Sequence, residues 1–158
     1  MTNAINRRRD MPARRHGSTS ADDWIALAGR IALALIFLWS GYGKLADIQG
    51  TVGYMSAHHM PAANVLVWLA LILELIGGAM LLVGWRARWA ALALAAFTLL
   101  AGLIFHNFWA VPPDQALNQT IHFMKNIAII GGLLQVAAFG PGRYSIDGKQ
   151  AESRPAPA

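Results

Sequence analysis

The chain has no cysteine and very little charge. Of its 158 residues, 13% are charged and 56% are hydrophobic, whereas a soluble domain carries roughly 25% charged residues. The absence of cysteine excludes disulfides, thiolate catalysis, cysteine-ligated zinc and cysteine-bound iron–sulfur clusters. The shortage of charge argues against a water-soluble domain, because a small domain exposes more surface than so few charged side chains cover. The composition indicates a membrane protein.

The charge that is present is unevenly placed. Lys and Arg number 13 against 8 Asp and Glu, which gives a net charge of +5. A basic chain can bind nucleic acid, but five of the arginines lie within the first fifteen residues, ahead of the apolar sequence. We therefore expect no nucleic-acid partner. We predict a disordered basic leader at residues 1–21, a membrane domain at 22–147 and a disordered tail at 148–158; a cleaved export signal is the alternative for the leader.

Four apolar segments, each about 20 residues long, have the length that crosses roughly 30 Å of hydrocarbon as a helix. They are approximately residues 24–43, 64–84, 88–108 and 120–139. A soluble four-helix bundle would carry polar stripes at helical spacing, whereas runs such as LALAAFTLLAGLIF are apolar on every side. The sequence therefore predicts an all-α fold, a four-helix bundle that is integral to the inner (cytoplasmic) membrane and spans it several times.

Lys and Arg residues fall on one side of this predicted bundle. The leader, the short turn at 85–88 and the tail hold ten of the thirteen, and the long links at 45–63 and 109–119 hold none. Because positively charged loops stay in the cytoplasm, we predict that both termini are cytoplasmic. Pro112 and Pro113 in the second long link predict an interruption of helical structure there.

Polar and ionisable side chains inside the apolar segments mark a candidate site, because such groups are costly in a membrane. A rise of 1.5 Å per residue places them in the outer half of the bundle, with Glu74 near the midplane. Several are three or four positions apart on one helix and so share a face. The candidate ligand-binding residues are Lys44, Glu74, His106, His122, Lys125 and Asn126. None is assigned a catalytic role.

We expect Glu74 to pair with Lys125, because an axial gap of about 7 Å is within reach of a lysine side chain. Structural interpretations stay open beside this one. Lys44 and Lys125 can extend to the outer headgroups, and Arg30 to the inner ones. The pair at Glu74 can also serve only to lock helix packing.

With both lysines charged, Glu74 ionised and the histidines neutral, the candidate residues carry a formal charge of +1. In a low-dielectric site this charge favours a small oxyanion or a polarised carbonyl oxygen. A quinone meets the same requirement, because its ring is apolar and its carbonyls need donors and protons. The alternatives are a non-enzymatic scaffold locked by buried charges and a histidine-based metal, haem or transport protein. No metal-ligand spacing and no cofactor site is visible in the sequence.

Four stretches of the sequence resemble the DoxX family of membrane proteins. They are RIALALIFLWSGYGKL, LILELIGGAMLLVGWRARWAAL, LIFHNFW and MKNIAIIGGLLQVAAFGPGRYSID, and together they cover about residues 24–147. The resemblance implies a four-helix integral protein of the inner membrane. Lys44, Glu74, His106 and Lys125 match recurrent polar positions in the helices of that family.

The resemblance also implies a range of roles. Similar chains include a membrane subunit of a thiosulfate:quinone oxidoreductase and a mycobacterial member that works with a superoxide dismutase and a sulfurtransferase. The expected partners are therefore the lipid bilayer and a soluble redox or sulfur-metabolism protein. On this basis the chain is at most the membrane subunit of an oxidoreductase complex, and whether it has an activity of its own stays open.

Overall fold

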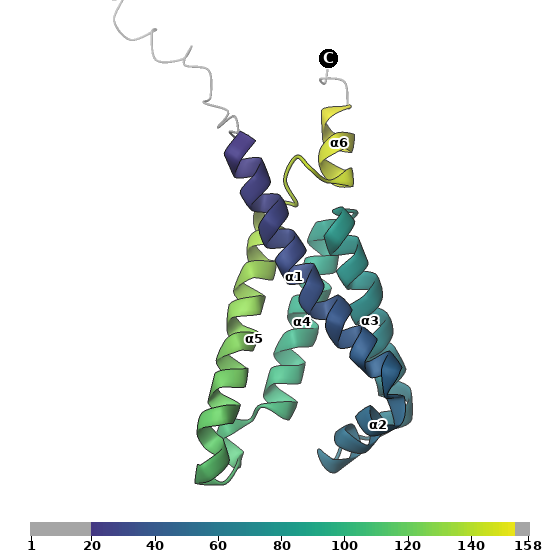
Figure 1. Ribbon diagram of the computed structural model, residues 1–158, viewed down its shortest axis with the longest axis vertical. Helices are drawn as coiled ribbons and strands as arrows, with labels where there is room; N and C mark the ends of the chain where they lie inside the picture. The colour runs from purple at the N-terminus through teal and green to yellow at the C-terminus, as the bar shows by residue number, and fades with distance from the viewer. Residues whose placement is uncertain (1–19, 154–158) are drawn as a thin grey trace, which may run out of the picture.

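The computed structural model describes residues 20–153, and all regular secondary structure in that range is helical (Figure 1). The elements are α1 (Ser20–Ala46), α2 (Ile48–Ala57), α3 (Ala63–Val83), α4 (Ala87–Phe105), the 3-10 turn η2 (Phe108–Ala110), α5 (Pro113–Phe139) and α6 (Ile146–Glu152). Within the described range, four helices are long and apolar enough to cross a membrane: α1, α3, α4 together with η2, and α5. This confirms the predicted all-α membrane bundle.

Two of the spans are longer than the sequence predicted. α1 has 27 residues and begins at Ser20, and α5 also has 27 and begins at Pro113. Proline lacks an N–H group, but the first turn of a helix has no intrahelical partner for that group, so Pro113 begins α5. The predicted interruption lies just before it, at Val111 and Pro112. The link at 45–63 contains α2, which begins where the Asp47 carboxylate accepts a hydrogen bond from Gly50 N at 2.8 Å.

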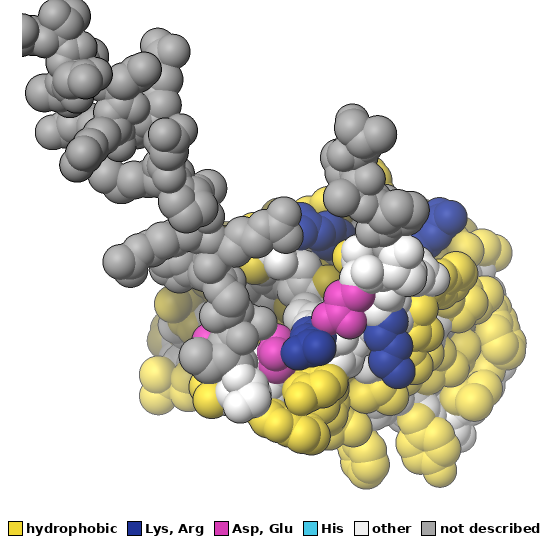
Figure 2. Space-filling view, turned by 90° about the horizontal axis from the view of Figure 1, so that it is seen from above, with side chains coloured by type: hydrophobic (Ala, Val, Ile, Leu, Met, Phe, Trp, Pro, Cys, Tyr) yellow, Lys and Arg dark blue, Asp and Glu magenta, His cyan; other side chains and the backbone are white. Residues whose placement is uncertain are grey.

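Both described ends of the chain lie at the same end of the bundle. α6 and the first residues of α1 occupy this terminal end, while α2 and the α4–α5 connection occupy the opposite one, the α2 end (Figure 1). Side chains of Lys and Arg gather at the terminal end, together with acidic side chains and inside a surround of hydrophobic ones (Figure 2). The two described ends therefore lie at one end of the bundle; that both termini are cytoplasmic stays a prediction.

Small residues bring the helices close together. A Cβ on Gly41 of α1 would lie 2.7 Å from Leu75 Cδ2 of α3, and one on Gly77 of α3 would lie 3.1 Å from Leu94 of α4. Close packing of this kind holds helices together in lipid, where the hydrophobic effect does not. The main buried cluster comprises Ala34, Phe37, Leu81, Ala91, Leu94, Ala95 and Leu133. It fills the half of the bundle nearer the terminal end.

Arg30 fastens the segment after α5 to the bundle. Its side chain is 2% exposed and donates hydrogen bonds to the carbonyl oxygens of Leu82 at 3.4 Å, Tyr144 at 2.6 Å and Pro141. The interpretation that Arg30 extends to the headgroups is therefore wrong. The guanidinium is held in the protein because it donates to one carbonyl in the last turn of α3 and to two in the connection between α5 and α6.

Asp147 fastens the same segment to α4. Its carboxylate accepts hydrogen bonds from the N–H groups of Arg86 and Ala87 at 2.8 and 2.9 Å, which begin α4. Its own N–H donates to the carbonyl oxygen of Gly84 at 3.0 Å. Gly84 has a φ of +71°, and a Cβ on Gly84 would collide with the Ser145 side chain.

The tail is helical where the sequence analysis predicted disorder. Ser145 accepts a hydrogen bond from Gly148 N at 2.9 Å and begins α6, which continues to Glu152. The prediction was therefore wrong for residues 148–152, because this cap and the Asp147 contacts hold the segment in place. Residues 154–158, and leader residues 1–19, lie outside the described range.

Candidate functional site

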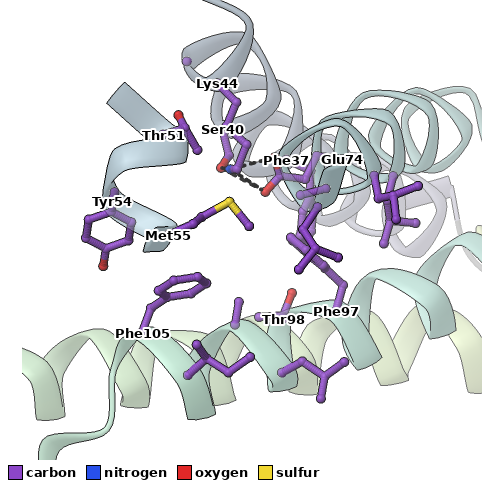
Figure 3. A pocket seen from close by; sticks show the side chains of 18 of the residues that line it. Phe37, Ser40, Lys44, Thr51, Tyr54, Met55, Glu74, Phe97, Thr98 and Phe105 are labelled. Carbon is purple, nitrogen blue, oxygen red and sulfur yellow. Dashed lines mark hydrogen bonds and ion pairs between the residues drawn. The ribbon is translucent and has the colours of Figure 1, made fainter. Parts of the chain in front are cut away.

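A cavity of about 720 Å³ lies in the half of the bundle nearer α2 (Figure 3). This volume is within the range of roughly 300–1,000 Å³ that pockets for small molecules occupy. Most of the lining is apolar and comes from α1, α2, α3, α4 and α5. The polar lining residues are Ser40, Lys44, Asp47, Thr51, Tyr54, Glu74, Thr98, His106 and Asn126.

An ion pair between α1 and α3 forms one wall of the cavity. Lys44 Nζ lies 2.8 Å from Glu74 Oε2 and donates a hydrogen bond to Glu74 Oε1 at 2.9 Å. Ser40 Oγ accepts from Lys44 Nζ at 2.8 Å and donates to the same Oε1 at 3.0 Å. Ser40 and Lys44 are one helical turn apart, so both reach Glu74 from the same face of α1. The Glu74 side chain is 4% exposed and the Lys44 side chain 20% exposed.

The predicted pairing of Glu74 with Lys125 is wrong. Lys125 is exposed on α5, does not line the cavity, and has no ion pair in the described part of the chain. Depth along a helix does not say which helices are neighbours. Gly41 brings α1 against α3 at Glu74, whereas α5 packs on α4. Lys44 is therefore the lysine beside the carboxylate.

The opposite wall carries polar groups from α4 and α5. Thr98 is buried and donates a hydrogen bond to the carbonyl oxygen of Leu94 at 2.7 Å, which leaves its oxygen able to accept one. Asn126 fits against α4 because Gly102 has no side chain: a Cβ there would lie 3.1 Å from Asn126 Nδ2. The Asn126 amide has no hydrogen-bond partner among the described residues, so it is available to a ligand.

The two predicted histidines stack at the α2 end, and one of them lines the cavity. The rings of His106 and His122 are 4.9 Å apart at 16°, and His106 Nδ1 lies 2.9 Å from Gln119 Oε1. Because a glutamine oxygen only accepts, Nδ1 donates and Nε2 of a neutral His106 is an acceptor. Within residues 20–153, no three side chains of His, Asp or Glu lie together as metal ligands. A three-ligand site for the histidine-based metal interpretation is therefore not seen among these residues.

α2 covers the end of the cavity. The Tyr54 ring stacks on Phe105 of α4 at 5.3 Å, and the His58 ring meets Phe105 edge-on at 5.1 Å. Met55 packs in a buried cluster with Val67 of α3. Partial burial raises the pKa of the Tyr54 phenol, so it keeps its proton at neutral pH. α2 is thus attached to both α3 and α4, and it shields the ion pair from that end of the bundle.

The charge of the cavity differs from the predicted value. The charged lining residues are one cation, Lys44, and two carboxylates, Asp47 and Glu74, so the formal charge is −1 with His106 neutral. The predicted value of +1 included Lys125, which lies outside. Lys44 and Glu74 balance each other and Asp47 is exposed, so the cavity offers a free anion no net positive charge.

The comparisons with known proteins agree with this architecture. The DoxX family model matches residues 25–107. Inner membrane protein YqjF of Escherichia coli is 39% identical over 126 residues, covering 80% of this chain and 92% of that protein. Inner membrane protein YphA of the same organism is 32% identical over 123 residues, covering 78% and 88%. A Surfeit locus protein 4 homolog of Schizosaccharomyces pombe is 30% identical over 129 residues, covering 80% of this chain and 38% of that protein.

No solved structure matches the chain. The described part of the chain has four helices that are long and apolar enough to span a membrane. The two bacterial relatives are inner membrane proteins and align with this chain over most of their length. The chain is a multi-pass inner membrane protein and belongs to the DoxX family.

Proposed function

We propose that this protein is a redox-linked membrane subunit that binds a quinone in the cavity beside Lys44 and Glu74. The observation that carries the proposal is an apolar cavity among membrane-spanning helices with an ion pair in its wall. A quinone has an apolar ring and carbonyl oxygens that need donors. The Lys44 ammonium has three N–H groups and lies within 2.9 Å of Ser40 Oγ and of both Glu74 oxygens, so a bound carbonyl would share these donors with the carboxylate.

The same wall supports proton exchange with a bound quinone. Reduction of a quinone takes up protons, and a carboxylate or an ammonium group within hydrogen-bond reach can relay them. Lys44 is the more exposed member of the pair and contacts both Ser40 and Glu74. In this proposal Lys44 orients the ring through one carbonyl, and a soluble redox or sulfur-metabolism partner exchanges electrons with the ring.

The two other candidate functions have less support. A small oxyanion has less support because Glu74 already neutralises Lys44, so the cavity wall has no unpaired cation for it. The scaffold interpretation explains the ion pair. It does not explain the cavity beside the ion pair or the Asn126 amide in the cavity wall, which has no hydrogen-bond partner among the described residues. A bound quinone would use the ion pair, the cavity and the Asn126 amide.

Equilibrium binding of a short-chain ubiquinone, followed by quenching of tryptophan fluorescence in detergent, tests the proposal. We expect the double variant Lys44→Met/Glu74→Leu to bind about 10- to 100-fold more weakly, because a hydrogen bond to a charged group contributes about 1.5–3 kcal/mol. The double variant is preferred to either single variant because it leaves neither Lys44 nor Glu74 without its charged partner. Lys125→Met is the matched control and should bind like the wild type. Equal affinity of the double variant and the wild type would contradict the proposal.

We also propose that the terminal end faces the cytoplasm. The turn between α3 and α4 and the tail carry lysines and arginines, whereas the segments at the α2 end carry none beyond the spans themselves. Reporter fusions after Arg86 and after Glu152 should read as cytoplasmic, and fusions after Ala57 and Gln115 as external. A tail that reads as external would overturn this orientation.

A further inference from the structure

Apolar side chains of α3 and α4 both line the cavity and reach the surface of the bundle. Leu69 of α3 and Leu100 of α4 both line it, yet their side chains are 57% and 58% exposed. Ile104, one turn further along α4, also lines the cavity and is exposed. Residues that both line the cavity and lie on the surface mark the places where it reaches the outside; Ile36 of α1 and Tyr54 of α2 are two others, 45% and 49% exposed. Leu69, Leu100 and Ile104, the side opening, are all apolar and lie on membrane-spanning helices.

The packing of α3 and α4 explains why the opening lies there. Towards the terminal end the two helices touch closely, because Gly77 admits the Leu94 side chain. At the other end α2 closes the gap, with Tyr54 stacked on Phe105. The cavity occupies the stretch between these two contacts. Its polar wall, at Lys44, faces Thr98 and Phe105 across the interior (Figure 3).

We infer that the ligand is a quinone with a long apolar tail, whose ring lies at Lys44 and whose tail leaves through the side opening into the bilayer. The inference rests on the proposed function and specifies its ligand class. One cavity of about 720 Å³ extends from the ion pair to Leu69 and Leu100. A quinone ring at Lys44 does not fill this volume, so the rest of the cavity can hold part of the tail. An opening lined by leucine and isoleucine offers a polar molecule no hydrogen-bond partner, whereas a hydrocarbon tail needs none.

A pair of neighbouring tryptophan substitutions tests this inference. Leu100→Trp places a bulky ring in the side opening. Leu99→Trp places the same ring on the next residue, which is also exposed and does not line the cavity. The probes are decylubiquinone and the corresponding tail-less dimethoxy-methyl-benzoquinone. We expect Leu100→Trp to weaken binding of decylubiquinone at least tenfold and to leave the tail-less probe within about twofold, because only the tail meets the new side chain. Leu99→Trp should bind both probes like the wild type.

The outcomes separate this inference from the proposed function. If Leu100→Trp binds decylubiquinone as tightly as the wild type does, the tail leaves elsewhere and the inference is wrong. Equal weakening of both probes also overturns it, because the tryptophan then displaces the ring and not a tail. If the wild type binds neither probe, the proposed quinone function itself fails.

Discussion

Replacing Lys44 with methionine or Glu74 with leucine is expected to lower the free energy of unfolding by about 3–5 kcal/mol in each case. Lys44→Met leaves the Glu74 carboxylate, only 4% exposed, without its partner. Glu74→Leu leaves the Lys44 ammonium, 20% exposed, without its partner, so its loss falls at the lower end of this range. The double variant should recover most of this loss, because two apolar side chains suit the site about as well as the ion pair does. Unfolding of the purified variants in mixed detergent micelles measures all three values.

Lys125→Met is the control for these three variants, since Lys125 is exposed and lies outside the cavity. Its free energy of unfolding should stay within about 0.5 kcal/mol of the wild-type value. If the losses of the two single variants simply add in the double variant, Lys44 and Glu74 are not coupled and the described pairing is wrong.

Arg30→Met is expected to destabilise the protein by several kcal/mol, about 3–6. The side chain is 2% exposed and supplies the donors for the carbonyl oxygens of Leu82, Pro141 and Tyr144. Each buried group left without a partner costs about 1–3 kcal/mol. The same unfolding measurement applies, and limited proteolysis should in addition show earlier cleavage in the segment after α5.

The matched control is Arg143→Met at the same end of the bundle. Arg143 forms an ion pair with Glu152 at 2.8 Å, but both side chains are more than half exposed. Such a pair contributes about 0–1 kcal/mol. Equal stability of Arg30→Met and Arg143→Met would mean that the buried guanidinium does not hold the segment.

The spans could be predicted from the sequence because lipid imposes a simple length rule on apolar helices. The four segments were placed correctly for this reason, and Glu74 was identified because a carboxylate at that depth needs a partner. The partner itself could not be predicted. The sequence placed Lys125 within axial reach of Glu74 and Lys44 at the outer end of its helix, whereas the close contact at Gly41 sets α1 against α3 beside Glu74.

The short helices were missed because local capping determines them. Asp47 begins α2 by accepting from Gly50 N, and Ser145 begins α6 by accepting from Gly148 N. A capping residue with a glycine three positions later was visible in both segments, although such a pattern is common in turns as well. The role of Arg30 had no sequence signal, because its acceptors are backbone carbonyls that every residue possesses.

The central claim is that the cavity beside Lys44 and Glu74 holds a quinone ring. Photolabelling with an azido-quinone, followed by mass spectrometry of the cleaved protein, tests it most directly. The account predicts labels on cavity residues of α1, α3 and α4, near Ser40, Ala70 and Thr98, and loss of the labels when decylubiquinone is present in excess. Labels spread over the lipid-facing side of α5 around Lys125, or labels that decylubiquinone does not displace, would contradict it.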